Sequence, residues 1–252
     1  MIFTKTNSTD TKINDNLENV IVLEKSSGSK EYISDKTNKI IKDEAGNVIA
    51  KQDDKELVYY KNEAIKTTVY NTIKVPFSKT FKITLSDGTI VHLNAGTTFT
   101  YPEQFVASEN SRNVVLKGEA FFEVKRDPSR PFVITSGAIK TTVLGTSFNI
   151  KAYNEKQPEV NVRTGKVKVE GETNTVLLLR GDKAVYTVVS STVKKEKTDI
   201  LEPEWKKALL YVDGLTLEQV LNKLKEENDF KVNYLEDDLK NLTIQGTLDS
   251  RQ

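Results

Sequence analysis

The chain has 252 residues, 37% hydrophobic and 29% charged, which is the balance of a globular protein with one large or two modest domains. Lys+Arg 37 against Asp+Glu 36 leave a formal net charge of +1, so we expect no nucleic-acid partner and no direct membrane contact. The absence of cysteine excludes disulfides, thiolate nucleophiles and cysteine-bound metal. No apolar run is long enough to span a bilayer and no signal peptide is recognisable, so we expect the export signal and anchor to lie outside this chain.

Composition and periodicity divide the chain into three parts. Residues 1–19 are polar and rich in Thr, Asn, Asp and Lys, and we expect them to be mobile because they bury little apolar surface. Residues 20–200 contain short runs with period-two alternation and frequent turn residues, and residues 201–252 follow a different pattern. The first boundary therefore lies near residue 20 and the second near residue 200.

The long middle part predicts a β-domain. Apolar and polar residues alternate from Phe81 to Leu85, and Asp87-Gly88 then predicts a type I′ hairpin turn. Gly46-Asn47 marks a similar turn. Short strands without an intervening helix exclude a parallel α/β domain, so the fold class is mainly β. An antiparallel sandwich, a barrel and a stacked solenoid all stay open.

The alternation also predicts which side chains form the core. Those on the inward faces should be mostly buried: Phe81, Leu85, Leu116, Phe122, Phe132, Val143 and Phe148.

The C-terminal part predicts a small α+β domain. The Pro203 region is a boundary, and a strand is expected towards the end of residues 205–212. Thr216 and Gln219 form a capping box ahead of an apolar stripe, which predicts a helix over 217–227 that stops at Asn228. Strands at 230–234 and 242–247 would give the order βαββ. We expect this order to be part of a larger α+β domain that is incomplete where the sequence ends.

Few residues could support catalysis. His92 is the sole histidine, and its alternation with Val91 and Leu93 indicates a strand residue on the less buried face. The carboxylates Glu119, Glu123 and Glu159 show no spacing that pairs them across a cleft, so they are interpreted as solvated strand residues. We therefore expect no metal, no cofactor and no metabolic enzyme.

Aromatic residues leave one alternative function open. A carbohydrate-binding or adhesin-like surface domain could use them as a sugar platform, whereas aromatic residues on strands more often form the core. The residues concerned are Tyr59, Tyr60, Tyr101, Phe105, Phe121 and Phe122. No calcium loop of the D-x-[DN]-x-[DN]-G type is present, which disfavours the adhesin.

Six ordered blocks resemble the FecR family. They are VP (75–76), LSDGTIVHLNA (85–95), YPEQF (101–105), RNVVLKGEAFFEV (112–124), RPFVI (130–134) and VLGTSFNI (143–150). His92 stands where many relatives carry an aromatic residue such as Trp. Residues 205–248 resemble, more loosely, part of the C-terminal domain of such proteins, which is related to the short N-terminal signalling domain of secretins and TonB-dependent transducers.

The resemblance implies a signal relay. Full-length relatives carry a cytoplasmic anti-sigma segment, one inner-membrane helix and a periplasmic sensor. A TonB-dependent outer-membrane transporter engages the sensor through its periplasmic signalling domain, and regulated proteolysis frees an extracytoplasmic-function sigma factor. The chain therefore resembles the periplasmic sensor region, without the cytoplasmic segment that contacts the sigma factor.

The resemblance also singles out two sets of site residues. Some relatives cleave themselves at a Gly-Thr bond, here Gly145-Thr146, by an N-to-O acyl shift that a strained peptide with unusual backbone geometry would favour. The structural alternative is that Gly145 marks a bulge or close approach. For partner binding, Trp205, Leu210 and Tyr211 are the candidates, on a strand at a sheet edge. Trp205 has an equally strong alternative role, packing the small domain onto the large one.

Overall fold

The structure is a computed structural model. It describes residues 20–33, 38–43, 45–53, 56–62, 65–77, 79–153, 157–207, 209–227 and 232–249. Side chains are described for all of these except residues 207, 209–211, 226–227 and 247–249. The predicted mobile segment 1–19 and the predicted helix stop at Asn228 lie outside the described residues.

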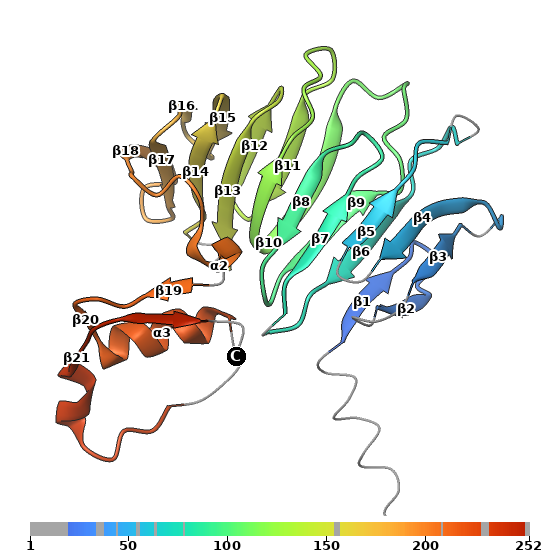
Figure 1. Ribbon diagram of the computed structural model, residues 1–252. Coiled ribbons are helices and arrows are strands. Elements are labelled where there is room, and N and C mark those ends of the chain that lie inside the picture. Colours follow the sequence, from blue (N-terminus) through green and yellow to red (C-terminus); the bar gives the residue numbers. More distant parts are fainter. Residues whose placement is uncertain are drawn as a thin grey trace, which may run out of the picture.

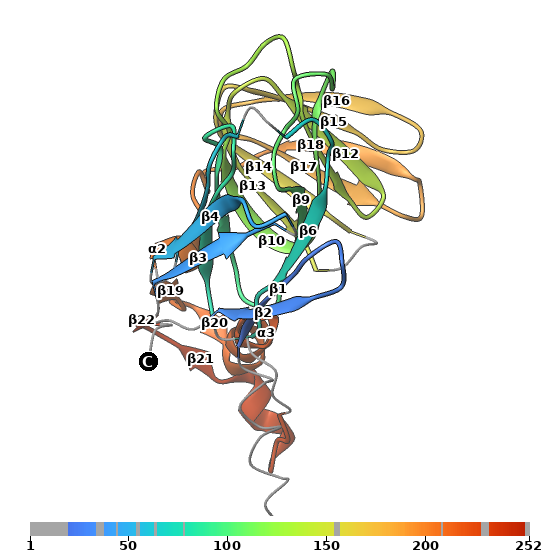
Figure 2. The same ribbon diagram turned by 90° about the vertical axis from the view of Figure 1, so that its right-hand side faces the viewer.

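Most of the described chain forms one large sheet that folds over into two facing halves (Figures 1 and 2). Half A contains, in spatial order, β2 (Lys30–Ile33), β1 (Ile21–Glu24), β6 (Tyr70–Lys74), β9 (Thr98–Pro102), β10 (Arg112–Glu123), β11 (Phe132–Ser136), β12 (Ile139–Val143), β15 (Lys166–Glu170) and β16 (Thr175–Leu179). Half B contains β3 (Lys39–Lys42), β4 (Val48–Asp53), β5 (Glu56–Tyr59), β7 (Phe81–Thr84), β8 (Ile90–Leu93), β10 again, β13 (Ser147–Ala152), β14 (Glu159–Thr164), β17 (Asp182–Thr187) and β18 (Thr192–Lys197). Paired strands are antiparallel, apart from the parallel pairs β10–β11 and β5–β7.

The long strand β10 joins the two halves. Its first part, up to Lys117, pairs with β9 and β11, and its second part, from Gly118, pairs with β8 and β13. Gly118 has φ 110°, and a Cβ at this position would lie 2.7 Å from the Cα of Thr97. Glycine is therefore needed where the strand passes from one half to the other. The inward side chains of both halves form one shared core, so the fold is a folded-over sandwich.

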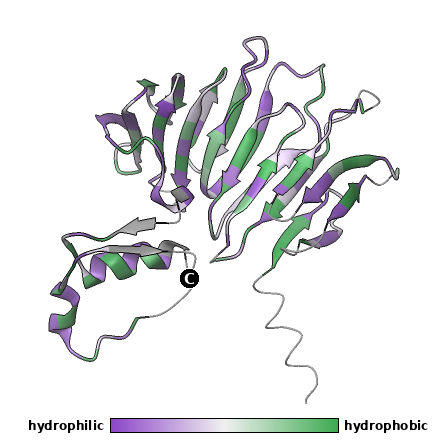
Figure 3. Cartoon of the chain, viewed as in Figure 1, coloured by the Kyte–Doolittle hydropathy of each residue, from purple (hydrophilic) through white to green (hydrophobic). Residues whose placement is uncertain are grey.

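The predicted core is confirmed. All seven side chains assigned to inward faces are at most 3% exposed. Hydrophobic and hydrophilic residues alternate along most strands (Figure 3), as expected for sheets that are packed on one face. The mainly β fold class is confirmed as well, and residues 20–197 contain no helix among those that the structure describes.

The hairpin at Asp87-Gly88 forms, but the predicted type I′ turn is wrong. Gly88 has φ 84°, whereas Asp87 does not lie in the left-handed region. The N–H of Gly88 donates to the Leu85 carbonyl at 2.8 Å, which indicates a type I turn followed by one left-handed glycine. The physical reason is the Asp87 carboxylate, which accepts hydrogen bonds from the backbone and the hydroxyl of Thr89 and so folds the turn around itself. The Gly46 turn has the same backbone pattern.

A buried ion pair ties the sequence blocks together. Arg112 Nη1 lies 2.6 Å from Asp87 Oδ2, and the two side chains are 1% and 7% exposed. The guanidinium also donates to the carbonyl oxygens of Lys125 and Arg130. Three of the six blocks therefore meet at one arginine, which shows a structural role for these residues.

The C-terminal part forms a small unit of short strands around one longer helix. Its elements are α2 (Glu204–Lys207), β19 (Leu209–Tyr211), β20 (Leu215–Thr216), α3 (Leu217–Glu227), the 3₁₀ helix η1 (Asp237–Asn241), β21 (Thr243–Ile244) and β22 (Thr247–Asp249). β19 pairs with β22 and β20 pairs with β21, both antiparallel. Among the described helices, none is long and apolar enough to cross a membrane.

Two predictions for this unit have different outcomes. The helix over 217–227 is confirmed, and so is its capping box, in which Gln219 N–H donates to Thr216 Oγ1 at 3.3 Å and Thr216 N–H donates to Gln219 Oε1 at 2.9 Å. The strand expected at 230–234 is wrong for residues 232–234, which form no strand, while 230 and 231 lie outside the described residues. The strand expected at 242–247 is interrupted, because Gly246 has φ 130° between β21 and β22.

Candidate functional site

The Gly145-Thr146 bond lies in the connection between β12 and β13. Gly145 does not have a left-handed φ, so this backbone conformation is not what requires a glycine here. What requires glycine is proximity, since a Cβ here would lie 2.6 Å from the Cα of Arg126. The close approach that the structural alternative expects at Gly145 is confirmed by this distance, and a register shift follows between Ser147 and Phe148.

Thr146 is held tightly, but its hydroxyl is unsatisfied. The threonine is 6% exposed, its carbonyl accepts the Val124 N–H at 2.9 Å, and its methyl group packs against Gly165. Its Oγ1 atom is buried and has no hydrogen-bond partner among the described residues. A buried hydroxyl without a partner is costly, which makes Thr146 a position that requires an explanation.

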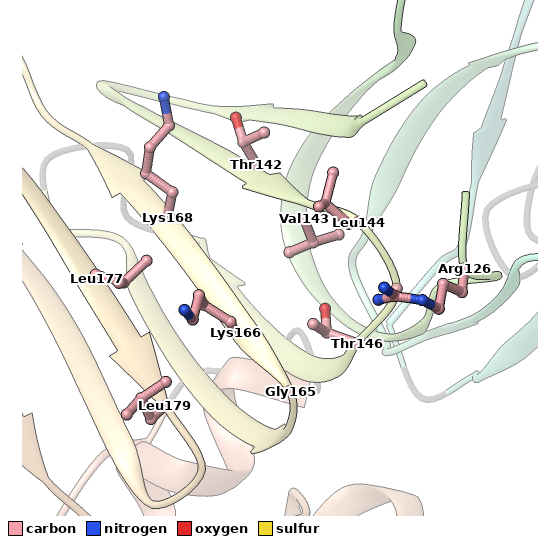
Figure 4. Close-up of a pocket in the computed structure, with 11 residues that line it drawn as sticks. Arg126, Thr142, Val143, Leu144, Thr146, Gly165, Lys166, Lys168, Leu177 and Leu179 are labelled. Carbon is pink, nitrogen blue, oxygen red and sulfur yellow. The ribbon is translucent and has the colours of Figure 1, made fainter. Parts of the chain in front are cut away.

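The Gly145-Thr146 bond lies at one end of a cavity of about 580 Å³ on the outer face of half A. We call this cavity the hollow. Figure 4 shows Thr146 beside Val143 and Leu144, with Lys166 along the wall. β12, β15 and β16 supply most of its lining, and Arg126 closes one side. No acidic side chain and no histidine line it among the described residues, so the hollow contains no evident general base.

The second feature lies on the outer face of half B, where α2 docks; we call it the joint. At its centre is Glu119, 7% exposed, which accepts hydrogen bonds from Asn149 Nδ2 at 2.7 Å and Asn94 Nδ2 at 3.2 Å. Burial raises the pKa of Glu119, and the two amide donors and Trp205 oppose this shift. The Trp205 Nε1 atom lies near Glu119, although its geometry does not meet that of a hydrogen bond.

Lys206 completes the joint. Its Nζ lies 4.2 Å from the centroid of the Phe121 ring, 3.4 Å from Glu123 Oε1 and 2.9 Å from Glu202 Oε1. Arg163 covers the same ring at 5.9 Å. Phe121 is therefore fully buried although it points away from the shared core, and the residues that cover it include one from α2.

His92 lies at the edge of the joint. Its Nε2 is 2.9 Å from Glu123 Oε1, and it lines a small cavity with Trp205 and Lys206. Burial lowers the pKa of His92, so at neutral pH the contact is a hydrogen bond from a neutral imidazole rather than an ion pair. Burial raises the pKa of Glu123, but His92 and Lys206 together lower it by more than burial raises it. The pKa of Glu123 therefore lies below its ordinary value. The predicted position of His92 on the less buried strand face is confirmed, since Val91 and Leu93 are fully buried.

The structure separates the three candidate partner-binding residues. Trp205 lies in the joint, consistent with its alternative role of packing the small unit onto the β-domain. Leu210 and Tyr211 belong to β19, but their side chains lie outside the described residues. Their role in partner binding stays a prediction.

The other candidates have structural environments. The core interpretation is confirmed for four of the six aromatic residues, Tyr59, Tyr101, Phe105 and Phe122. It is wrong for Phe121, which is buried outside the shared core in the joint, and for Tyr60, which is 47% exposed. Of the three carboxylates interpreted as solvated, Glu123 and Glu159 are partly exposed and pair with Lys206 and with Lys183, the latter at 2.8 Å. The interpretation is wrong for Glu119, which is buried in the joint and held there by the amide groups of Asn94 and Asn149. No group of histidine, cysteine or carboxylate side chains that could hold a metal occurs in the described part of the chain. Sequence reasoning anticipated only the contribution of Trp205 to the joint and missed the hollow, because each site combines strands that are not neighbours in the sequence.

The architecture, a folded-over β-sandwich followed by a small α/β unit, places the chain in the mainly β class. Residues 71–168 match the FecR protein family model. Two crystal structures of a candidate anti-sigma factor from Parabacteroides distasonis ATCC 8503, at 2.50 and 1.65 Å resolution, are similar. Each is 32% identical with a TM-score of 0.58; the matches cover 73% and 72% of this chain and 86% and 85% of the crystallised chains. No curated protein matches the chain.

The chain therefore belongs to the FecR family. Its role lies in anti-sigma regulation, and this agrees with the resemblance that the six sequence blocks carried.

Proposed function

We propose that the chain is the periplasmic sensor region of an inner-membrane anti-sigma regulator. In this role it receives a signal from a TonB-dependent outer-membrane transporter and relays it to an extracytoplasmic-function sigma factor, which a cytoplasmic segment outside this chain would bind. Family membership supports the regulatory half of the proposal. The observation that carries the sensing half is the small C-terminal unit, which offers an edge strand and is joined to the β-domain.

The edge strand is β19. It pairs with β22 on one side, and no other described strand pairs with it on the other. Its unpaired N–H and C=O groups are therefore a template to which a partner strand can add. Helix α2 immediately precedes β19 and contacts Glu123 through Lys206, so a partner at β19 would act next to the joint.

The test is binding between the complete periplasmic region and the signalling domain of the cognate transporter, measured by calorimetry. Tyr211→Ala should weaken binding by at least about 1 kcal/mol, because aromatic residues dominate binding hot spots. Tyr60→Ala is the matched control, since this tyrosine is 47% exposed on the β-domain. Absence of binding would contradict the proposal, and weakening by Tyr60→Ala alone would move the contact to the β-domain.

A carbohydrate-binding role is disfavoured by burial. A sugar platform needs exposed rings, whereas Tyr59, Tyr101, Phe105 and Phe122 are at most 8% exposed and belong to the core. A glycan array in which the purified chain binds one sugar class would reinstate that function.

We further propose that the Gly145-Thr146 bond undergoes a single self-cleavage. The Thr146 Oγ1 attacks the Gly145 carbonyl carbon, the C–N bond breaks, and the hydroxyl proton passes to the released nitrogen, leaving an ester and a free amine. Water then hydrolyses the ester, giving a Gly145 carboxylate and restoring the Thr146 hydroxyl. The supporting observation is the buried, unpartnered Oγ1.

Intact mass measured over a long incubation tests self-cleavage. Wild type should yield fragments 1–145 and 146–252, Thr146→Ser should still be cut, and Thr146→Ala should not. Thr142 lines the same hollow but does not belong to the scissile bond, so Thr142→Ala should be cut like wild type. A single intact species in wild type would show that this chain does not process itself.

A further inference from the structure

The hollow presents charges and apolar groups in an ordered pattern. On the outer face of half A, Lys168 lies opposite Leu177 on β16 and opposite Thr142 on β12. Lys166 lies opposite Leu179 in the next row of the same face. Leu144 extends the β12 side beyond Val143. A central line of lysines is therefore flanked by leucines and a threonine.

The leucines of the hollow are unusually exposed. Leu144, Leu177 and Leu179 are 40%, 48% and 49% exposed, on a concave surface of one protein face. Scattered single apolar residues need no explanation, but a concave cluster of them is typical of a binding surface. No described residue covers this cluster in the way that α2 covers Phe121.

The charges of the hollow all have one sign. Arg126, Lys166 and Lys168 line it, and none of the lining residues is acidic. Lys168 contacts Glu170 at 2.9 Å, and Glu170 lies outside the lining of the hollow. An occupant that complements this surface carries negative charge together with apolar groups.

The arrangement distinguishes between two kinds of anionic occupant. A lipid-like amphiphile carries its anionic group at one end, so it would suit a cavity with cations at one end. Here Lys166 and Lys168 lie between apolar side chains, which suits acidic groups interspersed with apolar ones. The outward edge of β16 is partly occupied, because the Leu177 carbonyl accepts Lys195 Nζ and the Leu179 N–H donates to Asp182. The occupant therefore lies on the sheet face rather than adding a strand.

We propose that the hollow binds a segment of a partner protein in which acidic and bulky apolar side chains are interspersed. The segment would lie across β12, β15 and β16 and cover the Gly145-Thr146 bond at the end of the hollow. The hollow is on half A, away from β19, so the inference goes beyond the proposed function. Loss of transporter binding and loss of segment binding are measured with different ligands and can be told apart.

The test uses nuclear magnetic resonance on the full chain, uniformly labelled with nitrogen-15. The probe is a synthetic hexapeptide of alternating leucine and aspartate, blocked at both ends. We expect saturable shifts of backbone amides in residues 142–146, 166–168 and 177–179. The same peptide with asparagine in place of aspartate should bind at least about tenfold more weakly, because the charge contacts are removed.

Variants of the chain assign the contact. The double variant Lys166→Gln with Lys168→Gln should weaken binding at least about tenfold, and Leu177→Ser with Leu179→Ser should do the same. Lys140→Gln is the matched control, because Lys140 lies on the exposed face of β12 outside the lining of the hollow, and it should leave the affinity unchanged. Unfolding midpoints equal to wild type establish that the variants fold.

Three outcomes would overturn the proposal. Amides of the hollow that do not shift at millimolar hexapeptide would show that it is not a peptide site. Equal affinity of the asparagine peptide would remove the charge argument. Decanoate binding in the hollow while the hexapeptide does not bind would identify an anionic amphiphile as the occupant.

Discussion

The outer faces of the two halves differ in what covers them. On half B, Phe121 is fully buried because Lys206 of α2 and Arg163 lie over its ring. On half A, three leucines stay 40% to 49% exposed beside three cations. The same sandwich thus has one outer face that its own chain occupies and one on which no described segment lies. The covered face of half B docks the helix α2, whereas the uncovered face of half A has the apolar and cationic side chains to bind a partner.

The largest expected effect is on the free energy of unfolding, and it differs between side chains on the inner and the outer face of β10. Phe122→Ala should destabilise the fold by about 3–5 kcal/mol, because it removes a ring from a core that relaxes only partly. Phe121→Ala should cost only about 1.5–3 kcal/mol, the value for transfer of the side chain, because α2 can move in to fill the space. Urea unfolding measures both. Equal losses would show that the joint is as rigid as the core.

A smaller effect is expected when the contacts that dock α2 over Phe121 are weakened. Lys206→Met keeps the apolar stem but removes the contacts to Phe121, Glu123 and Glu202, which should weaken docking of α2 by about 1 kcal/mol. Hydrogen exchange should become faster in α2 while the unfolding midpoint of the β-domain stays constant.

The control for this experiment is Lys183→Met, which breaks an ion pair to Glu159 on the same half, away from the joint. If both variants change the exchange of α2 equally, the Lys206 contacts do not hold the joint.

The smallest effect is a pH dependence centred on Glu119. Burial raises its pKa in the folded protein above the ordinary value of 4.5, so folding favours the protonated form. The stabilisation from this group is complete below pH 4.5 and is lost as the pH rises through the raised pKa. Glu119→Gln is neutral throughout, so its stability relative to wild type should increase over that window.

Urea unfolding of both proteins from pH 4.5 to 8 tests this dependence. The His92 contribution has the opposite sign, since its lowered pKa makes stability fall as pH falls, and it should cancel in the difference because both proteins contain it. A difference that does not change with pH would show that Glu119 keeps an ordinary pKa.

Local sequence signals predicted local structure well. The capping box at Thr216 and the apolar stripe predicted the helix Leu217–Glu227, and alternation predicted seven side chains that are buried in the core. The hairpin at Gly88 was predicted, but the predicted turn type was wrong, because the Asp87 carboxylate accepts hydrogen bonds from Thr89 and folds the turn around itself.

Features that depend on distant contacts were beyond the sequence. Phe121 is buried outside the shared core, and its burial depends on Lys206, far along the chain. The choice between sandwich and solenoid depends on β10 changing partners at Gly118, which no periodicity encodes. For the candidate site, the Gly145-Thr146 bond came from resemblance to a family, whereas the hollow around it requires β12, β15 and β16 to be adjacent.

The short connection between β18 and α2 has a further consequence for the joint. It consists of residues 198–203, so its reach is at most about 20 Å. A tether of this length holds α2 near its docking face at an effective concentration in the millimolar range, which lets contacts that are individually weak keep it docked. A competitor that binds only the docking face must reach a similar concentration to displace α2. A ligand that also binds β19 is itself held next to the docking face, so the tether no longer favours α2. Such a ligand would displace α2 at a much lower concentration than a ligand that binds the docking face alone.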